Sequence, residues 1–165
     1  TIKKTQGRIT GINIGIIGDL KYGRTVHSLA SALCLFGARF YFVSPKELQM
    51  PKQYLEKITQ HGLTYSMHEK IEDVIDKVDI LYVTRIQKER FPDQMEYEKL
   101  KNIYILRANM LLDAKNNMKI MHPLPRVNEI SSDVDKTQHA HYFEQAANGI
   151  PVRKALLALV LGKIK

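Results

Sequence analysis

The feature that most constrains the fold is an alternation of short apolar segments with segments whose apolar residues recur every three or four positions. The short segments, which have the length and composition of buried strands, are residues 12–17, 39–43, 63–67, 79–83, 103–106 and 119–121. The segments with helical spacing are residues 26–36, 51–61, 71–78, 96–100, 138–148 and 151–161. Strands that alternate with helices favour a mostly parallel sheet covered on both faces. We therefore predict a three-layer αβα fold of the α/β class.

Length and composition are those of one compact domain. The chain has 165 residues, of which 44% are hydrophobic, enough to bury a core. Its longest apolar run, residues 155–161, is far shorter than the roughly 20 residues that a membrane span needs. Cys34 is the single cysteine, so an internal disulfide is excluded. We expect a cytoplasmic protein that has no membrane partner.

The net charge of +8 leaves three interpretations open. The first is an ordinary lysine-rich surface. The second is nucleic-acid binding, but the basic residues are scattered and no stretch resembles a nucleic-acid-binding motif, so we expect no such partner. The third is a small anionic substrate, which needs only a few convergent arginines. Composition alone does not choose between the first and the third.

Glycines near the first strand raise the alternative of a nucleotide cofactor on a Rossmann-like sheet. Gly11, Gly15, Gly18 and Gly23 do not have the G-x-G-x-x-G spacing, and the second strand ends in a Ser-Pro pair where a nicotinamide binder would place an acid. The two histidines of the segment 139–144 are two positions apart and would not share a helix face. We predict a Rossmann-like sheet that has neither a cofactor nor a bound metal.

Three segments that leave predicted strand ends carry polar groups suited to an anion. Arg24, Arg85 and Arg126 lie in residues 19–25, 84–87 and 122–126, and strand ends of a parallel sheet meet at one edge. An arginine side chain matches a carboxylate with two parallel hydrogen bonds, and Gln87 can donate or accept beside it. The two prolines of 122–126 leave backbone carbonyls free to accept from an amine. The set suits a small dicarboxylate that bears an amine.

The end of the chain predicts a partner surface. Residues 155–161 are apolar around the whole circumference of the last helix, so we expect another domain or subunit to cover it. Residues 1–6 fit the tail of a helix whose beginning is absent. We therefore expect an α/β domain at 1–150 and a C-terminal helix at 151–165 that packs on a domain outside this sequence.

Five segments of the sequence resemble those of a known family. The resemblance covers essentially the whole chain, in the segments 18–28 (GDLKYGRTVHS), 84–90 (TRIQKER), 122–130 (HPLPRVNEI), 133–135 and 142–146. They are similar, in the same order, to the aspartate-binding domain of aspartate carbamoyltransferases. Relatives that act on ornithine carry a cysteine where this chain has Pro123, so the resemblance favours aspartate.

Matching positions carry implied roles. The resemblance implies that Arg24 and Arg85 hold the carboxylates of aspartate with help from Gln87, and that the backbone of Leu124 and Pro125 touches the carbamoyl group and the attacking amine. Supporting positions are Pro123, Glu89 (which would orient Arg85), Glu96 (in a mobile loop with Tyr97) and Arg126. The resemblance implies no metal or cofactor, and it assigns no catalytic residue to these segments.

The implied reaction transfers the carbamoyl group of carbamoyl phosphate to the α-amine of L-aspartate, giving N-carbamoyl-L-aspartate and phosphate in pyrimidine biosynthesis. The family's phosphate-binding segments do not occur here, so we expect these residues alone to be inactive. The resemblance implies a homotrimer of full-length chains, and it admits regulatory subunits or fused enzymes as further partners. Three alternatives stay open: a carbamoyltransferase for another amine, a nucleotide-dependent enzyme, and a noncatalytic anion-binding module.

Overall fold

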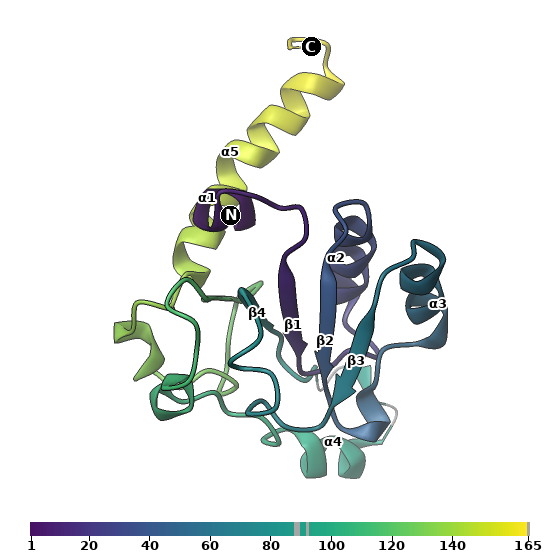
Figure 1. The fold of residues 1–165 in the computed structure, drawn as a ribbon, viewed down its shortest axis with the longest axis vertical. Helices are drawn as coiled ribbons and strands as arrows, with labels where there is room; N and C mark the ends of the chain where they lie inside the picture. Colours follow the sequence, from purple (N-terminus) through teal and green to yellow (C-terminus); the bar gives the residue numbers. More distant parts are fainter. Residues whose placement is uncertain (88–89, 92, 165) are drawn as a thin grey trace.

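A five-stranded sheet with all strands parallel forms the centre of the molecule in a computed structural model, which describes residues 1–87, 90–91 and 93–164 (Figure 1). The strands are β1 (Asn13–Ile17), β2 (Arg39–Val43), β3 (Tyr65–His68), β4 (Ile80–Val83) and β5 (Lys119–Met121). Their order across the sheet is β3-β2-β1-β4-β5. β2 and β3 therefore lie on one side of β1, and β4 and β5 lie on its other side. This architecture confirms the predicted α/β class.

Helices and short turns connect the strands. The α-helices are α1 (Ile2–Gln6), α2 (Arg24–Cys34), α3 (Lys52–Gln60), α4 (Gln94–Leu100) and α5 (Tyr142–Val160). Within the described residues, short 3-10 helices span Lys46–Leu48, Ala108–Leu111 and Val134–Lys136. None of the described helices is long and apolar enough to cross a membrane.

Alternation of side chains along the strands separates two cores. On one face, Ile14 and Ile16 of β1 pack with Val26 and Ala30 of α2 and with Ile58 of α3. The other face is covered by residues from turns and irregular segments together with the first residue of α5: Ile71, Val74, Tyr104, Met118 and Tyr142. Both faces of the sheet are therefore buried, as the continuous apolar strands require.

Gly18, directly after β1, brings two loops into close contact. Its φ is +115°, and a Cβ at this position would lie 2.2 Å from the carbonyl oxygen of Thr84. We expect Gly18→Ala to destabilise the protein by about 2–4 kcal/mol, because overpacking adds to the cost of a left-handed residue. Urea denaturation measures the change. Gly11→Ala is the control, since Gly11 also has positive φ but open space around it. Equal losses in the two variants would contradict the role given to the Thr84 contact.

Two sequence predictions on the second face are wrong. Residues 71–78 form successive turns instead of a helix, although the apolar residues Ile71, Val74, Ile75 and Val78 have helical spacing and are all buried. Backbone N–H groups of Val74 and Ile75 both donate to the carbonyl of Ile71. Residues 103–106 form no strand: Leu106 makes an isolated bridge with Ile130, because β5 already occupies the position beside β4.

The two helices predicted at 138–148 and 151–161 are also wrong, because one helix, α5, replaces them and contains both Gly149 and Pro151. Glycines that end helices here, such as Gly37 and Gly62, have positive φ, but Gly149 does not. The absent Cβ of Gly149 instead leaves room for the Arg153 guanidinium, whose Nη1 lies 2.7 Å from where that Cβ would be. A sequence pattern does not reveal the sign of φ.

Candidate functional site

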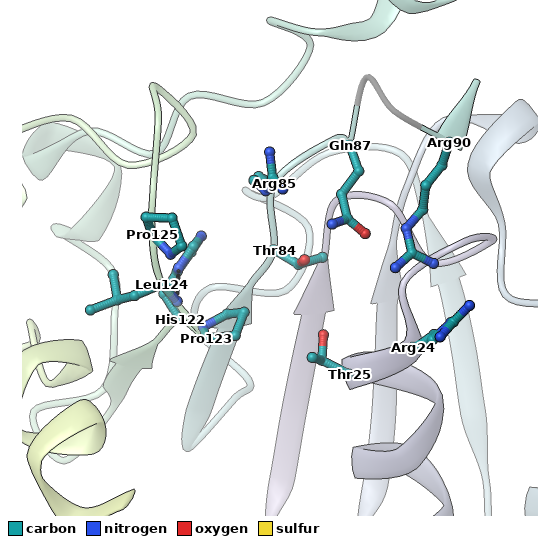
Figure 2. Close-up of a pocket in the computed structure, with 10 residues that line it drawn as sticks. All are labelled: Arg24, Thr25, Thr84, Arg85, Gln87, Arg90, His122, Pro123, Leu124 and Pro125. Carbon is teal, nitrogen blue, oxygen red and sulfur yellow. Dashed lines mark hydrogen bonds between the residues drawn. The ribbon is translucent and has the colours of Figure 1, made fainter.

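Segments that leave β1, β4 and β5 meet at the carboxyl edge of the sheet and enclose a cavity of about 150 Å³ (Figure 2). The residues that line it are Arg24, Thr25, Thr84, Arg85, Gln87, Arg90, His122, Pro123, Leu124 and Pro125. Three of them are arginines, and none of the described lining residues is acidic. The cavity therefore offers a positive potential to a small anion.

Arg24 and Arg85 reach the cavity from different elements. Arg24 is the first residue of α2, and Gly23 at the helix start lies so close to the Asp19 carbonyl that a Cβ there would be 2.4 Å away. The positive end of the helix dipole adds to the charge of Arg24. Arg85 and Gln87 follow β4, and Figure 2 shows Arg85 between Pro125 and Gln87. Two guanidinium groups on separate elements can hold two carboxylates of one ligand.

Arg90 connects the loop after β4 to the loop after β1. Its Nη1 donates a hydrogen bond to the Tyr22 carbonyl at 2.6 Å. Fully buried Asp19 accepts from the Tyr22 N–H at 2.8 Å, and its second carboxylate oxygen has no hydrogen-bond partner within the described part of the chain. Burial raises the pKa of Asp19, although this hydrogen bond and the charge of Arg90 oppose the rise. The two loops are thus held together beside the cavity.

The turn of residues 122–126 forms another wall of the cavity, and its backbone is unusual. Leu124 has φ of +52°, and the peptide bond between Leu124 and Pro125 is cis. A residue other than glycine in the left-handed region costs about 1–3 kcal/mol and persists only where its surroundings fix it. The Leu124 N–H donates to Nδ1 of His122 at 2.8 Å, which is one such fixing contact.

Buried Glu129 supports the same turn. One of its carboxylate oxygens lies 2.7 Å from Nε2 of His122, and the other accepts from the N–H groups of Val127 and Asn128 at 3.1 Å. Burial by itself would raise the pKa of Glu129, but these hydrogen bonds outweigh it, and the pKa lies below its usual value. Glu129 is therefore a carboxylate, and the turn closes on a fixed negative charge.

Arg126 does not line the cavity, unlike the other two arginines that the sequence placed at strand ends. It forms a bidentate pair with Asp135, with both N–O distances 2.5 Å, and it donates to the Tyr142 hydroxyl at 3.0 Å. The hydrogen bond to Asp135 raises the pKa of Arg126 and lowers that of Asp135. Arg126 thereby attaches the turn to the start of α5, which leaves its charge satisfied within the protein.

The structure brings together most of the residues that the sequence singled out, namely Arg24, Arg85, Gln87, Pro123, Leu124 and Pro125. Glu89 and the side chain of Glu96 lie outside the described residues. Four lining residues were not singled out: Thr25, Thr84, Arg90 and His122. Each stands within a segment of the resemblance, but nothing in the sequence distinguishes it from its neighbours. Over the described ranges, no group of three His, Cys, Asp or Glu side chains could hold a metal ion.

Comparison with known proteins agrees with this geometry. Residues 10–160 match the family model described as aspartate/ornithine carbamoyltransferase, Asp/Orn binding domain. The chain belongs to this carbamoyltransferase family. It is 56% identical over 163 residues to the aspartate carbamoyltransferase catalytic subunit of Chromobacterium violaceum, covering 99% of this chain and 54% of that protein. It is 56% identical over 164 residues to the same subunit from Vibrio vulnificus, with 99% and 53% covered.

Solved structures of the carbamoyltransferase family have the same fold. The catalytic subunit of M. jannaschii aspartate transcarbamoylase superposes with a TM-score of 0.88 at 50% identity, over 98% of this chain and 53% of that one. The Trypanosoma cruzi enzyme in complex with N-(phosphonacetyl)-L-aspartic acid gives 0.86 at 39% identity, over 94% and 51%. The chain therefore spans about half the length of the carbamoyltransferases that it matches.

Proposed function

We propose that this chain is the aspartate-binding part of an aspartate carbamoyltransferase, which makes N-carbamoyl-L-aspartate for pyrimidine biosynthesis. The observation that carries the proposal is the cavity itself: Arg24, Arg85 and Gln87 line it together with Leu124 and Pro125. The membership in a family whose model covers aspartate and ornithine enzymes supports the reaction class.

The cavity can perform the positioning that this reaction needs. Aspartate carries two carboxylates, and the guanidinium groups of Arg24 and Arg85 would bind one each. Its neutral α-amine would then face the carbonyls of the Leu124–Pro125 turn and attack the carbamoyl carbon of carbamoyl phosphate. A tetrahedral oxyanion forms and then collapses, phosphate leaves with the electron pair of the broken C–O bond, and one amine proton passes to the departing phosphate. The protein lowers the barrier by orienting the two substrates and stabilising the developing charge.

Charge favours aspartate over ornithine as the acceptor. The side chain of ornithine ends in an ammonium group, which the three arginines of the cavity would repel. The second carboxylate of aspartate would be attracted by the same charges. Pro123, where the ornithine-specific relatives carry a cysteine, is consistent with this choice.

The proposal for the complete enzyme is a cytoplasmic homotrimer of longer chains, in which the other half binds carbamoyl phosphate and residues 151–165 pack on that half. Regulatory subunits or fused enzymes are further partners that the family admits. Support for the longer chain and for this packing comes from the roughly twofold greater length of the relatives and from the exposed leucines of the C-terminal segment, which include Leu156 and Leu157 in α5 and Leu161 directly after it. Figure 1 shows the second half of α5 extending away from the sheet.

Glutamates at Leu157 and Leu161 are expected to raise the solubility of the 165-residue protein and to leave its fold intact. The two leucines are 65% and 69% exposed, and Leu161, the residue directly after α5, lies one turn from Leu157, so their replacement removes an exposed apolar patch. Surface changes of this kind usually alter stability by less than about 0.5 kcal/mol. Solubility and thermal melting measure both effects. Leu33→Glu, in the core, is the control that should unfold; unfolding by the α5 changes as well would place the helix in this domain's own core.

The direct test of the proposed function is an acceptor assay on the full-length enzyme. With carbamoyl phosphate and L-aspartate, we expect N-carbamoyl-L-aspartate and phosphate in equal amounts, and with L-ornithine we expect negligible product. A preference for ornithine or another amine would replace aspartate in the proposal. Absence of transfer to any amine by a folded protein that still binds dicarboxylates would favour a noncatalytic binding module.

A further inference from the structure

A buried histidine in the wall of the cavity has no part in the binding scheme above. The side chain of His122 is completely buried, and its ring lies between the backbone of Leu124 and the carboxylate of Glu129. Nδ1 is 2.8 Å from the Leu124 nitrogen, and Nε2 is 2.7 Å from the Glu129 oxygen. Each ring nitrogen therefore has its own hydrogen-bond partner.

The partners determine the tautomer of His122. A backbone N–H can only donate, so Nδ1 must accept from Leu124 and carries no proton. Nε2 therefore carries the proton and donates it to the Glu129 carboxylate. An imidazolium would place a proton on Nδ1 and abolish the bond to Leu124. The contact that fixes Leu124 thus requires neutral imidazole in this one tautomer.

The ring is anchored so that it can fix the turn. The backbone N–H of His122 donates to the side-chain oxygen of Gln145 in α5 at 2.8 Å. The carboxylate of Glu129 is itself held by the backbone N–H groups of Val127 and Asn128. The other end of this arrangement is Leu124, whose left-handed φ of +52° points its peptide groups away from their ordinary directions. The orientation of the Leu124 and Pro125 carbonyls therefore depends on the bond to Nδ1.

We propose that His122 is a positioning residue for carbamoyl transfer: its Nδ1 holds the Leu124–Pro125 backbone in the orientation that the attacking amine requires. The inference rests on the proposed function, in which that backbone faces the amine and the carbamoyl group. The two ring nitrogens then have separate tasks. Nδ1 serves the reaction through Leu124, whereas Nε2 serves folding through Glu129.

Two substitutions separate these tasks in the full-length enzyme. His122→Asn keeps an acceptor near the position of Nδ1, because an asparagine side chain readily accepts from the N–H two residues on; it loses the donor to Glu129. His122→Gln has the opposite properties, since its longer amide can donate to Glu129 from near the position of Nε2, and its oxygen no longer lies where Nδ1 accepted from Leu124. A role in folding alone predicts that activity follows stability in both variants.

We expect the two variants to rank oppositely in stability and in activity. H122Q should melt at the higher temperature, yet its kcat should fall roughly 100-fold, the loss expected when a reacting group is misplaced by about 1 Å. Its KM for aspartate should change less than about threefold, because Arg24 and Arg85 are untouched. H122N should melt at the lower temperature but keep kcat within roughly tenfold of the wild type, because the Leu124 bond is retained.

Steady-state kinetics with carbamoyl phosphate and L-aspartate, together with thermal melting, distinguish a positioning role of His122 from a role in folding alone. A well-folded H122Q that has wild-type kcat overturns the inference, and so does an H122Q whose loss lies entirely in KM. If H122N fails to fold, the H122Q measurement decides by itself. Wild-type enzyme without any carbamoyl transfer would refute the proposed function and the inference with it, whereas active wild type with unimpaired H122Q refutes the inference alone.

Discussion

Replacing Arg85 with alanine in the full-length enzyme is expected to lower kcat/KM for L-aspartate by roughly 30- to 4,000-fold, which corresponds to a loss of ~2–5 kcal/mol from a desolvated charge pair. Arg85 lines the cavity at the end of β4, beside Gln87 and opposite the Leu124–Pro125 turn. Aspartate differs from most amines by its second carboxylate, and a fixed guanidinium group would bind that additional carboxylate. The loss should therefore appear with aspartate and leave carbamoyl phosphate affinity nearly unchanged.

Two companion variants sharpen the Arg85 measurement. Arg85→Lys should also fail to restore normal saturation by aspartate, because an ammonium group cannot form the paired hydrogen bonds of a guanidinium. Arg39→Ala is the matched control: Arg39 is an exposed arginine at the beginning of β2, at the opposite end of the strands from the cavity. Near-normal kcat and KM in Arg85→Ala, as expected for a solvated surface arginine, would overturn its assignment to the aspartate site.

The 165 residues by themselves are expected to show no measurable carbamoyl transfer. The chain spans about half the length of its relatives, and the cavity presents groups suited to aspartate but no described segment that resembles the family's phosphate-binding loop. Holding both substrates together contributes on the order of 10⁵–10⁸ M in effective molarity, and a protein that binds one of them forfeits that contribution. An assay of the purified chain with carbamoyl phosphate and aspartate measures the rate.

Adding the carbamoyl phosphate-binding half as a separate chain provides the positive control. Recovery of activity on mixing would show that the 165 residues were folded and competent. Turnover at an ordinary enzymatic rate by the 165 residues alone would contradict the division of labour proposed here. A mixture that binds aspartate tightly yet never forms product would favour the noncatalytic binding module.

The sheet and the meeting of three loops follow from the sequence because both depend on periodicity and on strand direction. Apolar segments such as residues 12–17 and 79–83 are long enough to mark strands, and parallel strand ends meet at one edge. The second face was harder, because residues 71–78 have helical spacing but form turns, and residues 103–106 have the length of a strand but make only an isolated bridge. The length of α5 was missed because Gly149 and Pro151 usually mark ends of helices, and only the backbone reveals that they do not.

Within the site, the sequence predictions failed for a different reason. Arg24, Arg85 and Arg126 look alike in the sequence, yet Arg126 faces Asp135, nine positions later, in place of the cavity. His122 pairs with Glu129 across a turn whose shape depends on the left-handed Leu124. Hydrogen bonds of this kind depend on the local backbone path, which no spacing rule encodes, so sequence motifs locate the site without assigning each side chain its partner.

The most direct test of the central claim is a crystal structure of the full-length enzyme with N-(phosphonacetyl)-L-aspartate, a ligand that carries the two carboxylates of aspartate. We predict that guanidinium nitrogens of Arg24 and Arg85 will lie within about 3 Å of the carboxylate oxygens, with Gln87 beside them and the Leu124–Pro125 backbone facing the amide of the ligand. A ligand whose carboxylates bind outside this cavity, or that leaves both arginines in solvent, would contradict the assignment of the aspartate site.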